Sequence, residues 1–210
     1  MKRFLKTMLL LSFSTTIALA QEYPLNENGE AEFVEVVEVD LQQKTLYANA
    51  KEWVATTFGD YKSVIQFEDD ENYKLILKGL SKVPYIGKIF DKEEKVGYIV
   101  TIECKDGKYR YRISDIVVNE TRRVLGRVNS SKFTTLSHLE MIELWIARLE
   151  ELNAVDASKL RKKERDTHYR KIKETESLID DHQTFYTREY NVLISLIESL
   201  KNAMRVDNSF

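Results

Sequence analysis

The 210-residue chain contains one cysteine, two prolines and seven glycines. The single cysteine, Cys104, excludes an intramolecular disulfide, so the fold must be held together without a covalent cross-link. The scarcity of proline and glycine argues against low-complexity linkers and repeat arrays. After the first twenty residues there is no apolar run of the ~20 residues that a membrane-spanning helix needs. The chain is long enough for one sizeable core and an appended helical piece.

Motifs that carry well-known chemistry are also missing. The sequence has no Gly-x-Ser-x-Gly nucleophile motif, no phosphate-binding loop and no glycine-rich dinucleotide fingerprint. Its three histidines, His138, His168 and His182, lack the spacing of a zinc site. The acidic run Asp69-Asp70-Glu71 lacks the pattern of a calcium loop and is typical of a turn. We therefore predict no cofactor, no metal ion and no assignable catalytic residue.

Residues 1–20 have the layout of a secretory signal peptide. Three positive charges precede a short apolar stretch, and Ala18-Leu19-Ala20 supplies the small-x-small triplet that precedes a cleavage site. We predict cleavage between Ala20 and Gln21 and export of the remaining residues. The periplasm is the favoured destination, while association with the outer membrane and release from the cell stay open.

Removal of this leader makes the chain distinctly acidic. The whole sequence has 32 Lys and Arg against 34 Asp and Glu, a formal net charge of −2. The leader contains three of the basic residues and none of the acidic ones, so the mature chain has a net charge of −5. Affinity for nucleic acids rests mainly on the neutralisation of phosphates by Lys and Arg. The charge therefore disfavours a nucleic-acid partner.

The chain after the leader changes from a strand pattern to a helix pattern. Residues 21–31 are polar and are predicted to be a flexible N-terminus. A valine-rich stretch at 32–39 predicts a strand. Apolar residues then recur at helical spacing, so that 40–58 is predicted to be one amphipathic helix. Asp40 is its expected N-cap, and Gly59 follows its last turn.

Two antiparallel hairpins are expected next. The first joins strands at 63–68 and 73–80 through a short acidic turn. The second spans 97–115, where Asp106-Gly107 is the strongest two-residue signal for a type I′ turn, because both central residues need a positive φ. A tight turn there pairs Lys105 with Lys108 and separates an apolar face from a charged one. The apolar face holds Tyr98, Val100, Ile102, Cys104, Tyr109, Tyr111 and Ile113; the charged face holds Thr101, Glu103, Lys105, Lys108, Arg110 and Arg112.

The charged face of this second hairpin is the candidate binding surface. Lys108, Arg110 and Arg112 form a basic stripe, and Glu103 lies opposite Arg110. A charge run of this kind is usually a solvated, salt-bridged surface. The other interpretation is a sheet face that binds an anion or a protein partner. On the opposite face, Cys104 is expected to act as a small apolar residue rather than as a nucleophile.

The second half of the chain is predicted to be helical. Residues 119–135 are polar, show no period and are predicted to be a linker. A helical period extends over 136–204, with a break near 153–158 where Asp156 is a candidate cap, and 205–210 form a tail. These helices are expected either to cover the apolar sheet face or to project as an αα-hairpin. A sheet with one wet face and helices that need a partner predicts a two-layer α+β domain.

Several stretches of the chain resemble a known domain family, covering 32–118 and the final helix. The family consists of exported bacterial domains of unknown function with a TATA-binding-protein-like (TBP-like) fold. The resemblance implies a β-α-β-β-β-β-α core and implies no catalytic residue. A fold name does not imply DNA binding, because fold and function separate readily. The matching stretches are the first strand up to Asp40, Leu46-Tyr47-Ala48-Asn49-Ala50-Lys51-Glu52-Trp53, Ser63-Val64-Ile65-Gln66, the run from Tyr98 through Asp106-Gly107 to Asp115, and Leu196-Ile197-Glu198-Ser199-Leu200 with the residues up to Met204.

Together these patterns predict a TBP-like α+β domain whose antiparallel sheet has helices on one face, with a C-terminal helical extension. The expected function is a non-catalytic binding domain for a protein or an envelope component. Homo-oligomerisation through the C-terminal helices stays open. The alternative function is a hydrolase with an unrecognised site made of carboxylates and His138 or His182.

Overall fold

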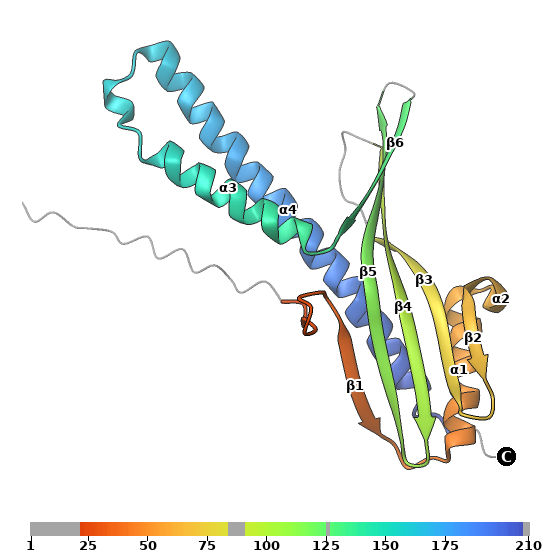
Figure 1. The fold of residues 1–210 in the computed structure, drawn as a ribbon. Helices are drawn as coiled ribbons and strands as arrows, with labels where there is room; N and C mark the ends of the chain where they lie inside the picture. Colours follow the sequence, from red (N-terminus) through yellow and green to blue (C-terminus); the bar gives the residue numbers. More distant parts are fainter. Residues whose placement is uncertain (1–21, 84–90, 125–126, 208–210) are drawn as a thin grey trace, which may run out of the picture.

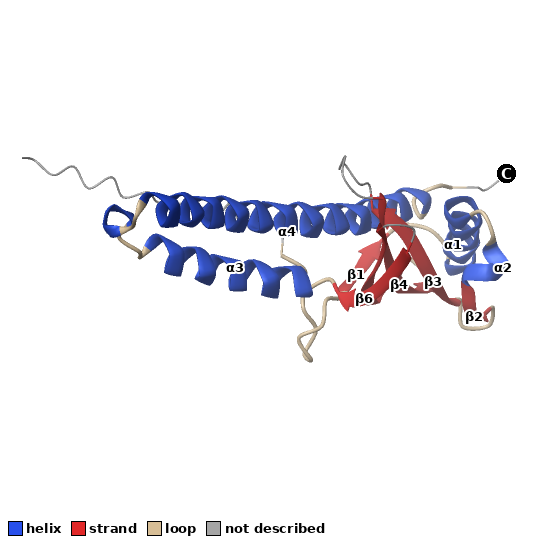
Figure 2. Ribbon diagram, turned by 90° about the horizontal axis from the view of Figure 1, so that it is seen from above, coloured by secondary structure: helices blue, strands red, loops and turns tan. Residues whose placement is uncertain are grey.

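The structure is a computed structural model that describes residues 22–83, 91–124 and 127–207. One six-stranded antiparallel sheet forms a layer, and helices lie against one of its faces (Figures 1 and 2). The strand order is β1-β5-β4-β3-β2, and β6 also pairs with β5. The elements are β1 (Phe33–Glu38), α1 (Gln43–Phe58), α2 (Tyr61–Val64), β2 (Ile65–Asp69), β3 (Lys74–Val83), β4 (Asp91–Lys105), β5 (Lys108–Val124), β6 (Arg127–Thr134), α3 (Ser137–Asn153), a short 3-10 turn (Ala157–Lys159) and α4 (Lys162–Ala203).

The β4–β5 hairpin has the register that the sequence predicted. Cys104 pairs with Tyr109, Ile102 with Tyr111 and Lys105 with Lys108, around a Gly107 whose φ is 78°. The side chains of the predicted apolar face are all buried. Burial raises the pKa of the Cys104 thiol to about 12, so the thiol stays protonated and acts as an apolar core residue.

The two alternatives for the C-terminal helices are both realised within one helix. The second half of α4 lies against the sheet, and its first half leaves the sheet and pairs with α3 in a projecting αα-hairpin (Figures 1 and 2). The buried side chains of the covering half include Tyr186, Leu193 and Leu200. In the connection between α3 and α4, the Asp156 carboxylate accepts a hydrogen bond from the Ser158 N–H at 3.1 Å, as expected of a cap.

The start of α1 corrects the sequence prediction. The helix begins at Gln43, and its N-cap is Gln42 rather than Asp40. The N–H of Gln43 donates instead to the Asp106 carboxylate at 2.9 Å. In the same turn, the Gly107 carbonyl accepts a hydrogen bond from the Val39 N–H, and the Gly107 N–H donates to the Leu41 carbonyl. The first turn of α1 is therefore capped by Asp106, from a distant turn, and not by the nearby Asp40. The sequence of the helix alone does not reveal such a cap.

The predicted linker at 119–135 is wrong, because residues 119–124 and 127–134 belong to the sheet. Strand β5 continues to Val124, and β6 pairs with it along residues 117–124. The pattern was hidden by a β-bulge: Asp115 has a φ of 50°, and the pairing of β5 with β4 shifts by a residue there. Beyond the bulge the inward positions change phase, and one of them is the buried Glu120 instead of an apolar residue.

The N-terminal stretch at 22–31 is also ordered rather than flexible. Leu25 and Ala31 form an antiparallel bridge, and Tyr23 is buried. The Tyr23 ring contacts Phe33 and Tyr186 edge-on, with centroids 5.7 and 5.3 Å apart, and its N–H donates to the Tyr186 hydroxyl at 3.2 Å. This aromatic packing outweighs the polar composition of the segment.

Candidate functional site

The predicted binding residues lie on the face of the sheet opposite α1 and α4, called here the outer sheet face. Arg110 donates from Nε to a Glu103 carboxylate oxygen at 2.7 Å, and Lys74 lies 3.2 Å from the other oxygen. Partial burial opposes ionisation of Glu103, but these two cations hold its pKa below the usual range. Arg112 makes a longer ion pair, 3.7 Å, with Glu32. The stripe is therefore salt-bridged, and its cations still outnumber its carboxylates.

Basic residues extend over much of the outer sheet face. Because side chains alternate along a strand, the register places nine Lys and Arg at described outward positions, with three acidic residues, Glu38, Asp69 and Glu103. A fourth acidic residue, Asp115, is exposed at the bulge of β5 and borders the same face. A depression of about 830 Å³ is bordered on this face by Lys78, Lys95 and Lys132. The nine cations are Lys74, Lys78, Lys82, Lys95, Lys105, Lys108, Arg110, Arg112 and Lys132.

Apolar side chains are interspersed with these cations. Val34 and Val36 on β1 are exposed, and the register places them opposite Arg112 and Arg110. Exposed apolar side chains beside Arg are typical of surfaces that contact proteins. The outer sheet face is therefore both basic and partly apolar, which a purely solvated face would not require.

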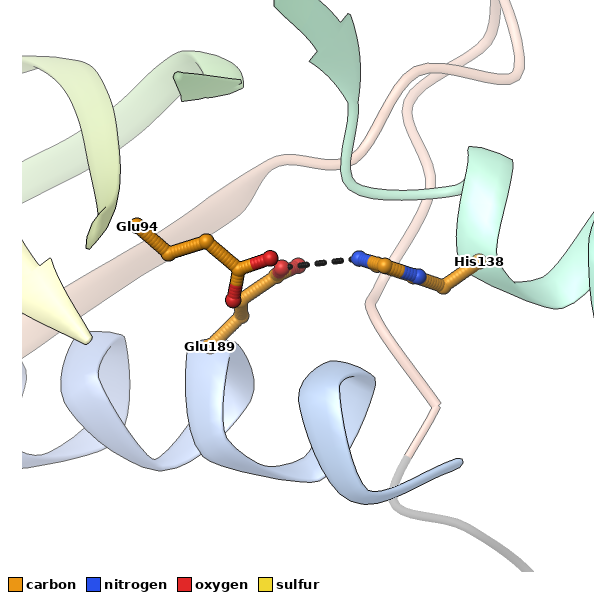
Figure 3. A group of neighbouring side chains, drawn as sticks. All are labelled: Glu94, His138 and Glu189. Carbon is orange, nitrogen blue, oxygen red and sulfur yellow. Dashed lines mark hydrogen bonds and ion pairs between the residues drawn. The ribbon is translucent and has the colours of Figure 1, made fainter. Parts of the chain in front are cut away.

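A second, buried cluster lies where the helical hairpin leaves the sheet. Figure 3 shows Glu94 from β4, His138 from the first turn of α3 and Glu189 from α4 directed toward one another. Their exposed fractions are 2%, 4% and 0%. One ligand-type atom from each lies within 4.8 Å of those of the other two. No metal ligand was predicted from the sequence, in which these residues lie far apart.

Hydrogen bonds orient this cluster. His138 Nε2 lies 3.0 Å from one Glu189 oxygen, and the Thr135 hydroxyl donates to the other at 3.0 Å. His138 Nδ1 lies 2.9 Å from Nδ1 of His182, so one of these two nitrogens carries the shared proton. The ring of Phe185 stacks on His138, with centroids 5.9 Å apart. The imidazole of His138 is thus fixed on both of its nitrogens and on one face.

The position of these residues explains why the sequence did not show the cluster. His138 and Glu189 are 51 positions apart and on different helices, so no local spacing connects them. His182 is partly buried on α4, and its Nδ1 faces His138. The one usable signal was Glu189, a carboxylate on the same stripe, because a buried charge needs a partner.

The chemistry open to the cluster follows from its burial. Two carboxylates and an imidazole could exchange protons or hold a cation, but with exposed fractions of 4% or less the three groups are closed to a bulky substrate. The neighbouring Thr135 hydroxyl donates to Glu189 and is itself buried. The geometry therefore suits a buried ion site better than the hydrolase site considered as the alternative.

Comparison with known proteins agrees with the fold. A crystal structure of a TBP-like protein from Parabacteroides distasonis ATCC 8503 is 14% identical, with a TM-score of 0.53, and the match covers 90% of this chain and 99% of that one. A DUF4468 family protein from Bacteroides ovatus ATCC 8483 has the same identity and TM-score, over 90% and 93% of the two chains. No curated protein sequence matches the chain.

The domain built around the sheet thus has a TBP-like α+β fold, as the resemblance implied. More particularly, residues 33–119 match the family model described as "Domain of unknown function (DUF4468) with TBP-like fold". Among the helices that the structure describes, none combines the length and the apolar content needed to cross a bilayer.

Proposed function

We propose that the protein is an exported, non-catalytic binding module whose outer sheet face docks an acidic segment of a protein partner. The observation that carries this proposal is the charge of the face. Nine cations and four carboxylates, Asp115 at the bulge included, occupy its described strand positions, although the mature chain is predicted to be acidic overall. Such a concentration of one sign steers an oppositely charged partner toward the surface.

A protein is favoured over a nucleic acid or a lipid surface. The exposed Val34 and Val36 provide apolar contact area beside Arg110 and Arg112, which a phosphate backbone would not use. The uncovered face is also a pleated sheet surface with regularly spaced side chains, which fits an extended peptide. The expected net charge of −5 opposes close approach to a polyanionic duplex.

Charge reversal on the sheet face tests this proposal. We expect the Arg110→Glu/Arg112→Glu variant to bind poly-L-glutamate roughly tenfold more weakly than the parent, because two attractive contacts become repulsive. The measurement is fluorescence anisotropy with labelled poly-L-glutamate at two salt concentrations. Affinity for the parent should fall as salt rises.

The matched control is Lys162→Glu/Lys163→Glu at the start of α4, which changes the net charge equally but lies outside the outer sheet face. This variant should bind like the parent. Equal losses in both variants would show a non-specific charge effect and contradict the proposal. Binding of the parent to phosphatidylglycerol vesicles but not to poly-L-glutamate would also contradict it and would point to a membrane surface.

Export is the second part of the proposal and rests on residues 1–20, which, with Gln21, lie outside the described residues. We expect the chain to be recovered from the periplasmic fraction with Gln21 as its first residue. Intact-mass spectrometry of the purified protein measures this directly. A protein that keeps Met1 through Ala20 and stays inside the cell would contradict export, and the Ala18→Glu/Ala20→Glu leader variant, which blocks the cleavage site, provides the control.

A further inference from the structure

We propose that Glu94, His138 and Glu189 bind one divalent transition-metal ion, with Zn²⁺ as the best fit, and that this ion clamps the helical hairpin to the sheet. The proposal concerns the buried cluster and is independent of the outer sheet face. It rests on the side chains that converge there, on the hydrogen bonds behind them and on the elements from which they come.

The ligand set matches the preferences of zinc. An imidazole nitrogen and carboxylate oxygens bind Zn²⁺ at about 2.0–2.2 Å, and zinc sites with three protein ligands leave a fourth position for water. The three ligand atoms already lie within 4.8 Å of one another, so small side-chain rotations would bring them around one ion. Nε2 of His138 lies 3.0 Å from Glu189 and would bind the ion through its lone pair. In that state neutral His138 would carry its proton on Nδ1 and donate it to Nδ1 of His182, whose own proton would lie on Nε2.

A supporting shell is already in place behind the ligands. A metal-binding histidine almost always uses its other ring nitrogen in a hydrogen bond, and ligating carboxylates are themselves hydrogen-bonded. His138 Nδ1 meets His182 Nδ1 at 2.9 Å, and the second Glu189 oxygen accepts from Thr135 at 3.0 Å. These contacts fix the orientation of two ligands before any ion arrives.

Electrostatics favours a dication at this place. With His138 neutral, the two carboxylates bring two negative charges to side chains that are at least 96% buried. Carboxylates in the protein interior are costly unless they are paired or coordinate a metal. A dication held between the two carboxylates would place positive charge next to both of them at once.

The origin of the ligands gives the ion a structural role. Glu94 belongs to the sheet, His138 to the first turn of α3 and Glu189 to α4. These elements meet where the hairpin departs from the sheet (Figures 1 and 3). An ion held by all three would join the hairpin to the domain at its base and would stabilise the folded chain, because the unfolded chain cannot gather the ligands.

Cobalt and zinc binding by the purified protein test the proposal. After removal of bound metal with a chelator, titration with Co²⁺ should produce the visible absorption of a low-coordinate site with an endpoint of one ion per chain. Zn²⁺ should abolish this absorption and raise the Tm. We expect Glu189→Gln and His138→Gln to weaken Co²⁺ binding roughly a hundredfold or more, and Thr135→Val about tenfold.

The matched controls are His168→Gln and Glu140→Gln, which remove the same types of side chain outside the cluster and should bind Co²⁺ like the parent. Because Glu189→Gln also disturbs the bond to His138, Glu94→Gln provides a ligand variant that leaves this bond intact. A parent protein that binds neither ion would overturn the proposal. So would Glu94→Gln and His138→Gln variants that fold and bind Co²⁺ as tightly as the parent.

Discussion

Replacement of Leu193 by alanine is expected to lower the free energy of unfolding by about 2–5 kcal/mol. Leu193 lies in the half of α4 that covers the sheet, its side chain is fully buried, and it belongs to the main hydrophobic core. Its truncation removes apolar burial and leaves a cavity that the surrounding strands can only partly fill. Urea denaturation followed by far-UV circular dichroism measures the effect.

The same substitution at Leu144 provides the control. Leu144 is on α3 in the projecting hairpin, and its side chain is 59% exposed. Its loss should change the free energy of unfolding by no more than about 0.5 kcal/mol. Equal effects at the two positions would mean that burial at Leu193 does not determine the loss, contrary to its place in the core beneath the sheet.

A methyl group added to Gly79 is expected to cost about 1–3 kcal/mol of stability. Gly79 pairs with Tyr98 across β3 and β4, and a Cβ at this position would lie 2.2 Å from Cε2 of the Tyr98 ring. The ring has nowhere to move easily, because it is 99% buried and its hydroxyl lies 2.6 Å from the Ser81 hydroxyl. Gly79→Ala should therefore lower the Tm and alter the near-UV circular dichroism of the tyrosines.

Gly97→Ala is the control for this steric effect. It shows how much the Tm changes when a glycine in a strand is replaced without a severe clash. A Cβ at Gly97 would lie 3.3 Å from its closest neighbour, Cγ2 of Val117, and a small shift would relieve that contact. Its effect on the Tm should be small, since the loss of backbone freedom in the unfolded chain favours alanine. A Gly79→Ala protein as stable as the parent would show that the Tyr98 ring is not fixed over the glycine.

The features that the sequence could predict are those encoded by neighbouring residues. The Asp106-Gly107 turn determines the register of β4 and β5, and with it the burial of Cys104 and Tyr109. The stripe of apolar residues likewise identified the last helix, because a period of 3.6 persists along it. In both cases each residue constrains others a few positions away.

What the sequence could not predict depends on contacts between distant residues. The bulge at Asp115 changes the phase of the strand, so that the sheet continues through residues whose composition suggests a linker. The N-cap of α1 comes from Asp106, 63 positions away from Gln43. The buried cluster requires β4, α3 and α4 to meet, which only the completed fold brings about.

The length of α4 has a mechanical consequence. The helix runs over 42 residues, roughly 60 Å, from the tip of the projecting hairpin to the core beneath the sheet. A continuous helix resists bending. A force applied at the tip would therefore reach the side chains in the second half of α4, which packs on the sheet. Because the same helix forms the projecting hairpin and packs in the core, a displacement of the tip would be transmitted to buried side chains such as Leu193 and Leu200.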